Sequence, residues 1–425
     1  MLNRQQAPPF QKIQEIHLPQ VALHHLSNQI PVHAFHIGIQ EIVQVEFVFY
    51  AGSWFDLKNG QSYFTLKMLE EGTQERNAQQ IQEAIDQYGA FLELQNGFDQ
   101  VSIVLYTLTR HLDKVLPVVK EMIMQASFPE AELELLKKRT AEQIKVNSEK
   151  NAYLAARRFR ELIFGAHPYG QSIYQADVEA ITRNDLSTFY KQYIHLGNCE
   201  ILVAGKADAR VIAQLEAVFG TEPVRRVQPN YRDKEVKASF KKEHIHKNGS
   251  LQASIRIGKQ LFSKTHPDYF KMLVSNEILG GYFGSRLMQN IREEKGLTYG
   301  IYSQVSFLGQ TGFFAIGTDV NLENTERAIE EIYNEVQSLA KEPVSPEELE
   351  KVKNYMAGVF AGQLTTAFSV LDLYKSAYFY QLSPDFYQNY LKNIEKVSAE
   401  DVQRVVEKYL DPQTMAQVVV GAQQA

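Results

Sequence analysis

A helix-compatible stretch near residue 65 has the spacing of a metal site without the residues that hold a metal. Positions 63, 66 and 67 share one helix face, an arrangement in which two imidazoles bind zinc and a carboxylate between them activates water. These positions hold Tyr63, Leu66 and Lys67. A phenol is neutral near pH 7, a leucine has no titratable group, and an ammonium repels a cation. The stretch therefore predicts no zinc chemistry in this chain.

The same stretch, residues 60–73, resembles the inverted zinc motif of the M16 peptidase family, which includes insulin-degrading enzyme, pitrilysin and mitochondrial processing peptidase. In that motif His-x-x-Glu-His lies between a glycine and a Gly-Thr pair. The resemblance implies that Tyr63 and Lys67 stand at the histidine positions and Leu66 at the glutamate. The third ligand, a glutamate on a later helix, matches Glu142.

We hypothesise that Lys67 and Glu142 form an ion pair where zinc would otherwise lie, because a buried carboxylate without a partner is costly. The alternative is that both are solvated surface charges, which contribute little to stability.

The second half carries a sharper resemblance to the same family. Its residues are Gly280-Gly281-Tyr282-Phe283-Gly284-Ser285-Arg286-Leu287, followed by Arg292-Glu293-Glu294-Lys295-Gly296-Leu297-Thr298-Tyr299. The resemblance implies that Arg292 and Tyr299 hold the substrate carbonyl during zinc-assisted attack. A guanidinium and a phenol suit that role, since each donor aimed at a developing oxyanion contributes about 3 kcal/mol. We expect Arg292 in the last turn of a helix and Tyr299 at the start of a strand; the alternative is ordinary packing of both side chains.

The two halves of the chain repeat one pattern at a fixed offset. The segment from Ile181 aligns with the segment from Val397, 216 positions later, and Gly205 aligns with Gly421 in the same register. Several anchors in one register indicate an internal duplication.

Strands alternate with helices in each half. Strands are predicted over 42–50, 101–107, 200–204, 251–257 and 311–318, and helices over 63–70, 78–88, 112–126, 267–294 and 345–360. The fold class is therefore α+β: two homologous halves, each a mixed sheet with helices on one side, closing as a clamshell. We predict an N-terminal domain over 1–218, a linker over 219–250 and a C-terminal domain over 251–425.

Composition argues against several classes of partner. The chain has 425 residues, a net charge of −6 and no basic cluster, so nucleic acid is not expected. No apolar run is long enough to span a bilayer, and the N-terminus has no secretory pattern, so we expect a cytoplasmic protein. The lone Cys199 is expected to be an inert core thiol. The histidine pairs, among them His33 and His36, are interpreted as surface or turn residues.

These features favour a zinc-less subunit, inactive as a peptidase alone, that pairs with a zinc-bearing homologue and binds unfolded or extended peptides. Zinc is expected in the partner and no cofactor in this chain. A purely structural or substrate-capturing protein is the alternative, and an independent enzyme with non-metal chemistry is a third hypothesis. Retention of Arg292 and Tyr299 favours the first.

Overall fold

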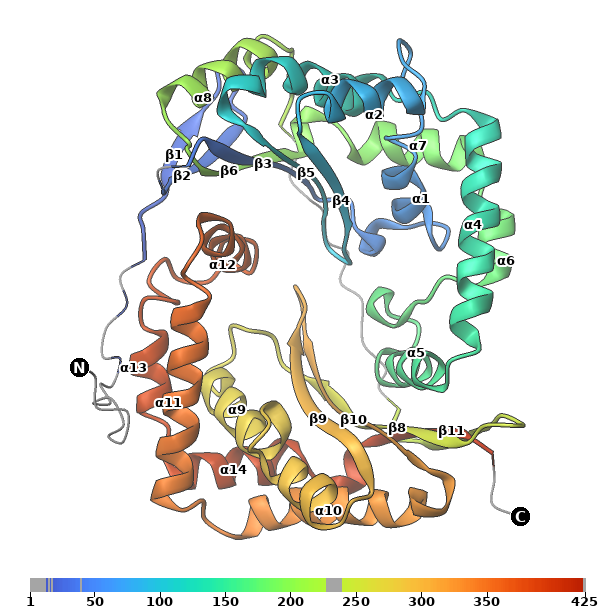
Figure 1. The fold of residues 1–425 in the computed structure, drawn as a ribbon, viewed down its shortest axis with the longest axis vertical. Helices are drawn as coiled ribbons and strands as arrows, with labels where there is room; N and C mark the ends of the chain where they lie inside the picture. Colours follow the sequence, from blue (N-terminus) through green and yellow to red (C-terminus); the bar gives the residue numbers. More distant parts are fainter. Residues whose placement is uncertain (1–12, 14–15, 17, 39, 227–238, 423–425) are drawn as a thin grey trace, which may run out of the picture.

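The computed structural model describes residues 13, 16, 18–38, 40–226 and 239–422. The chain forms two α/β halves that face each other (Figure 1). The first half contains β1 (Ala22–His25), β2 (Pro31–His36), β3 (Ile42–Phe49), α1 (Gln61–Lys67), α2 (Ala78–Asp86), β4 (Phe91–Asn96), β5 (Val101–Leu108), α3 (Leu112–Gln125), α4 (Glu130–Ser148), α5 (Asn151–Phe164), α6 (Gln175–Ala180), α7 (Arg183–Tyr193), β6 (Cys199–Gly205) and α8 (Ala209–Leu215).

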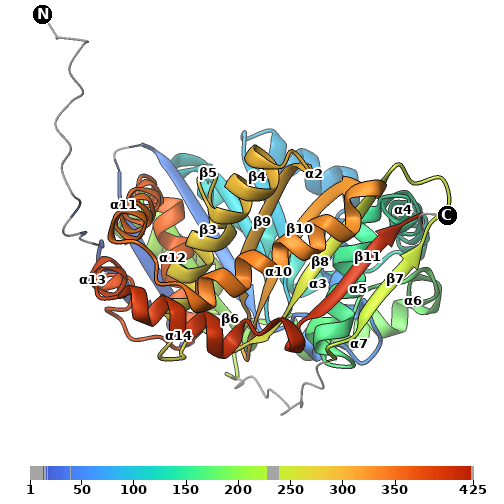
Figure 2. The same ribbon diagram turned by 90° about the horizontal axis from the view of Figure 1, so that it is seen from below.

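The second half repeats this order with fewer elements. It contains β7 (Lys242–His246), β8 (Gln252–Leu261), α9 (Tyr269–Asn276), β9 (Thr298–Phe307), β10 (Gly312–Asn321), α10 (Thr325–Lys341), α11 (Pro346–Gly362), α12 (Ala367–Phe379), α13 (Tyr390–Glu395), α14 (Ala399–Tyr409) and β11 (Ala416–Gly421). Figure 2 shows α10 and α14 lying along the outer face of its sheet. The described residues also form π-helical segments at Glu216–Gly220, Glu277–Gly281 and Met288–Glu294.

The strand orders of the two sheets confirm the duplication. The first sheet runs β1-β2-β6-β3-β5-β4 and the second β7-β11-β8-β10-β9, so the second matches the first without β1. In each sheet the last strand of the half, β6 or β11, pairs parallel to one neighbour and antiparallel to the other. Helices α7 and α14 begin at Arg183 and Ala399, 216 positions apart, and both start with a capping box.

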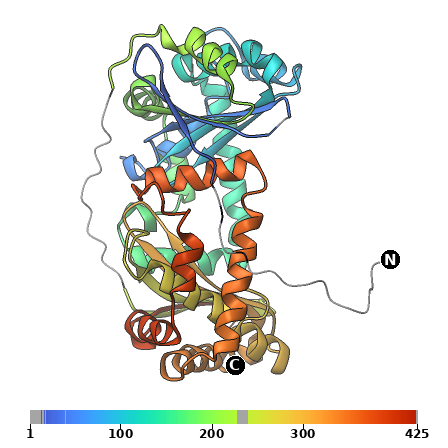
Figure 3. The ribbon, with the colours of Figure 1, turned by 90° about the vertical axis from the view of Figure 1, so that its left-hand side faces the viewer.

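The halves exchange one helix each. Helix α5 of the first half packs on β8 and β11 of the second, and α12 of the second half packs on β2 and β6 of the first. Figure 3 shows the orange helix α12 turning away from α11 into the space between the halves, and the two helices are bent by 111°. Each exchange buries apolar residues; under α12 they are Phe35, Val48, Leu202, Ala204, Val370 and Leu371. The exchange makes the inner face of each sheet part of a core.

Two predictions about the elements are wrong in detail. The linker predicted over 219–250 ends too late, because β7 already pairs with β11 inside the second sheet. The single helix predicted over 267–294 is interrupted: α9 passes into a π-helical turn, and the chain breaks at Tyr282, which has an extended backbone. Gly280 explains the close packing there, since a Cβ would lie 2.5 Å from the backbone nitrogen of Ser303 on β9.

No single helix of the described segments has the length and apolar composition needed to cross a membrane. The bent pair of α11 and α12 meets that test on length and composition.

Candidate functional site

Helix α1, which carries the altered motif, starts at a turn that only a glycine adopts readily. Gly60 has a φ of 94°, in the left-handed region. The carboxylate of Asp56 accepts hydrogen bonds from the backbone N–H groups of Gly60 at 3.0 Å and Ser62 at 2.8 Å. It thereby satisfies N–H groups that the first turn of a helix leaves unpaired. This anchoring sets the direction in which the motif positions point.

The three motif positions have different surroundings. Leu66 is 0% exposed and belongs to the core. Tyr63 is half-buried, and its ring meets Phe64 edge to face with centroids 5.2 Å apart. Lys67 is half-buried in the last turn of α1. Burial raises the pKa of Glu70, and the charge of Lys67 opposes that rise. The Lys67 ammonium therefore interacts with the carboxylate of Glu70, three residues later in the same segment.

The predicted ion pair between Lys67 and Glu142 is wrong. Glu142 lies on α4 and is exposed to solvent. Among the residues that the structure describes, no ion pair involves either side chain. A solvated carboxylate has no desolvation cost to offset, so it does not require the ammonium as a partner.

The residues at the motif do not fit zinc. Leu66 offers no donor atom and Lys67 carries a positive charge. Neither can join the exposed Glu142 as a zinc ligand. The described part of the chain holds no group of three histidine, cysteine, aspartate or glutamate side chains that could bind a metal ion.

Arg292 lies in the helical turn predicted for it. The π-helix Met288–Glu294 ends at a tight turn in which Gly296, with φ of 62°, donates to the Arg292 carbonyl at 3.2 Å. The Arg292 guanidinium lies 4.7 Å from the ring centroid of Phe283, which is 64% exposed, and its Nη1 is 3.3 Å from Glu293. A guanidinium stacked on an aromatic ring is held in place while its outer edge stays available for hydrogen bonding.

Tyr299 begins β9 as expected and is 93% exposed. Its hydroxyl has no hydrogen-bond partner among the described residues. Such exposure is unusual for a tyrosine that serves packing, because its ring normally buries a large apolar area. The side chain is therefore free to meet another molecule.

The structure does not bring Arg292 and Tyr299 to the altered motif. Tyr63 lines a pocket that includes Asn96 and Phe98, at the turn between β4 and β5, and neither Arg292 nor Tyr299 lines it. Strand β9 pairs with β10 in a hairpin, with Phe307 next to the turn and Thr298 at the opposite end of the strand. Tyr299 is eight residues from Phe307, about 26 Å along an extended strand.

Two family models match consecutive parts of the chain. One, described as insulinase (peptidase family M16), matches residues 36–177, and the other, described as the peptidase M16 inactive domain, matches residues 180–356. The chain belongs to the M16 peptidase family.

Relatives of this M16 chain carry mixed descriptions. It is 25% identical to an uncharacterized zinc protease of Bacillus subtilis over 71% of this chain and 73% of that protein. It is 22% identical to a protein of Helicobacter pylori named a non-peptidase homolog, over 84% and 83% of the two chains. A crystal structure titled peptidase M16 inactive domain, from Pseudomonas fluorescens, has a TM-score of 0.84 and 24% identity, covering 95% of this chain and all of that one. This likeness confirms the fold.

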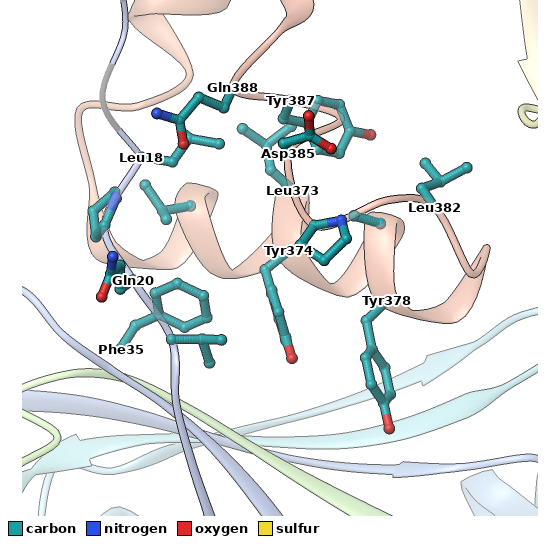
Figure 4. Close-up of a pocket in the computed structure, with 15 residues that line it drawn as sticks. Leu18, Gln20, Phe35, Leu373, Tyr374, Tyr378, Leu382, Asp385, Tyr387 and Gln388 are labelled. Carbon is teal, nitrogen blue, oxygen red and sulfur yellow. The ribbon is translucent and has the colours of Figure 1, made fainter.

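A polar network beneath α12 was missed by the sequence analysis. His33, interpreted there as a surface or turn residue, is 1% exposed on β2. Its Nδ1 is 2.7 Å from the Tyr374 hydroxyl and its Nε2 is 3.0 Å from Glu200. Burial, with the charge of Glu200, raises the pKa of Tyr374 to about 12. Figure 4 shows Tyr374 and Tyr378 pointing from α12 toward the first sheet. The sequence did contain a signal for this burial. Side chains alternate between the two faces of a strand, so His33 lies on the same face as the apolar Phe35.

The tips of two hairpins meet where the halves join. The Asp99 carboxylate accepts hydrogen bonds from the Tyr169 hydroxyl at 2.7 Å and from the Gly309 backbone N–H at 3.2 Å. Burial raises the pKa of Asp99, and these two hydrogen bonds oppose the rise. Asp99 and Gly309 line a polar cavity of about 640 Å³ between the halves.

Proposed function

We propose that this M16 chain is the zinc-less subunit of a two-chain zinc peptidase. It binds extended peptides and supplies Arg292 and Tyr299 to the scissile carbonyl in the zinc site of a partner, a zinc-bearing homologue of similar length. One observation carries the proposal: Tyr299 is 93% exposed and Arg292 is stacked on an exposed ring, in a chain whose own motif lacks zinc ligands.

The chemistry supports a role in trans. A tetrahedral intermediate develops negative charge on oxygen, and a guanidinium with a phenol can donate hydrogen bonds to it. Neither donor is consumed by a buried partner within the described chain, since Arg292 contacts the half-exposed Glu293 and Tyr299 has no hydrogen bond.

A free sheet edge supports peptide binding. Strand β4 is the last strand of the first sheet and, among the strands that the structure describes, pairs only with β5, so its outer edge can accept an added strand. An extended peptide adds to such an edge by main-chain hydrogen bonds. Phe91 on this strand is 61% exposed and provides an apolar contact.

The test is hydrolysis of a fluorogenic peptide by the reconstituted pair of this chain and a homologue that carries His-x-x-Glu-His. We expect no hydrolysis by the isolated chain. Arg292→Ala and Tyr299→Phe should each lower kcat of the pair by about 10²- to 10³-fold with little change in KM, as for loss of one oxyanion donor. Arg327→Ala is the matched control, because Arg327 is an exposed arginine on α10.

Two outcomes contradict the proposal. Unchanged turnover by an assembled pair containing Arg292→Ala would favour the alternative of a structural or substrate-capturing subunit. Turnover by the isolated chain would favour an independent enzyme.

A further inference from the structure

A pocket of about 490 Å³ lies directly beside the altered motif, between α1, α4 and α5. Ser62 and Tyr63 contribute to it from α1, and Arg157 and Arg160 from α5. Its volume is within the range of small-molecule sites, about 300–1,000 Å³. The first half therefore has a cavity of ligand size beside the stretch that resembles a zinc motif.

Arg160 lines this pocket, and among the described residues no carboxylate forms an ion pair with it. The residue is half-buried. Its Nη2 donates to the Ser172 hydroxyl at 3.3 Å, its Nε is enclosed without a hydrogen-bond partner, and its guanidinium lies 5.5 Å from the Phe98 ring. Burial lowers the pKa of Arg160, and the nearby charge of Glu161 opposes that fall. Removing a guanidinium from water costs free energy unless an anion pairs with it, so an anionic ligand would be stabilised here.

The other charges at the pocket leave it positive. Arg157 lies 4.4 Å from the Tyr174 ring, and its Nε is 4.0 Å from Glu161, the limit of an ion pair. Glu161 is shared, because it also accepts hydrogen bonds from Arg158 and from the Tyr174 hydroxyl. The carboxylate of Asp56, also at the pocket, is directed to backbone N–H groups of α1.

The remaining wall combines polar side chains, among them Asn96, Gln143 and Asn147, with apolar surface. The Ser62 side chain is 1% exposed, lines the pocket, and its Oγ has no hydrogen-bond partner. Tyr63, Ile144 and Ile173 line the same pocket with aromatic and aliphatic groups. A ligand matching this wall has an anionic group at one end and an apolar body at the other.

We propose that this pocket binds a carboxylate that carries an apolar or aromatic group, with Arg160 as its principal charge partner and Arg157 as the second. The planar edge of a guanidinium matches the two oxygens of a carboxylate. The carboxylate can belong to a small organic acid or to the C-terminus of a peptide. This binding site goes beyond the proposed function and does not depend on the Arg292 and Tyr299 pair.

The experiment is calorimetric titration of the full chain with hippurate, an aromatic carboxylate, and with its uncharged amide. We expect hippurate to bind and the amide to bind at least tenfold more weakly. Arg160→Gln should weaken hippurate binding about 10- to 100-fold, as for loss of a charged hydrogen-bond partner. Arg160→Lys should retain part of the affinity. Arg139→Gln on the exposed side of α4 is the control that makes the same charge change away from the pocket.

Further arms separate the two sources of carboxylate. An N-acetylated tetrapeptide with a free C-terminus that binds more tightly than hippurate, and loses this affinity when amidated, identifies a peptide terminus. Tighter binding of hippurate identifies a small acid. The proposal is overturned if neither probe binds, if the amides bind as well as the acids, if inorganic phosphate binds in preference to both, or if Arg160→Gln and Arg139→Gln, with circular dichroism spectra like that of the wild type, have equal effects.

Discussion

Removing Lys375 of α12, the ion-pair partner of Glu46 on β3, should weaken the union of the two halves. The Lys375 ammonium lies 2.5 Å from Oε1 of Glu46, whose side chain is 1% exposed. The second oxygen, Oε2, is enclosed without a hydrogen-bond partner. Replacing Lys375 by methionine keeps the stem of the side chain and leaves a buried carboxylate uncompensated.

The expected loss follows from the burial of Glu46. Removing one partner of a buried pair costs about 3–5 kcal/mol, because the remaining charge stays desolvated. For a domain of roughly 200 residues, about 2–4 °C accompanies each kcal/mol, so Lys375→Met should lower the unfolding temperature by roughly 10 °C. The double variant Glu46→Gln with Lys375→Met should recover most of this loss, since no uncompensated carboxylate remains.

The assay is thermal unfolding by circular dichroism for the two single variants and the double variant. Lys351→Met on the neighbouring helix α11 is the control, because Lys351 is exposed and its loss should cost less than about 0.5 kcal/mol. The reasoning is refuted if Lys375→Met and Lys351→Met unfold at the same temperature. It is also refuted if the double variant is no more stable than Lys375→Met alone.

Two further predictions follow from buried titratable groups. Because burial raises the pKa of Asp99 above 3.8, the folded protein holds that proton more tightly than the unfolded chain; the free energy of unfolding should therefore fall as pH rises through the raised pKa. Asp99→Asn should remove this slope in urea titrations between about pH 4 and about pH 7. Burial also raises the pKa of the fully buried Cys199 thiol, so a disulfide reagent should label Cys199 at the rate of unfolding, and rapid labelling of the native protein would contradict this.

Local patterns were sufficient to predict the duplicated architecture. Thr182 and Ser398 each cap a helix whose third residue, Asp185 or Asp401, returns a hydrogen bond, and such signals depend on neighbours in sequence. The same is true of the turn between Arg292 and Tyr299, where Gly296 ends the helix.

Local sequence patterns could not predict the exchange of helices between the halves. Strand β3 alternates Val43, Val45 and Phe47 with Gln44 and Glu46, which is typical of a strand with one face in water. All five are buried, because α12, more than 300 residues later in the chain, covers the polar face. The error over Lys67 and Glu142 has a similar origin: matching two positions to a motif predicted proximity, while only packing determines which carboxylate meets solvent.

Helix α12 limits the surfaces of the first half that the proposed peptide substrate could contact. It covers the inner faces of β2 and β6, and its Lys375 also donates to Gln95 of β4 at 3.4 Å. A peptide therefore cannot lie flat on that inner face without displacing α12 and covering Glu46 in place of Lys375, which leaves a buried carboxylate unpaired at a cost of several kcal/mol. Addition to the outer edge of β4 leaves both helix and ion pair in place. Peptide capture should accordingly leave the Lys375 and Glu46 pair intact, so Lys375→Met should lower stability far more than it lowers peptide affinity.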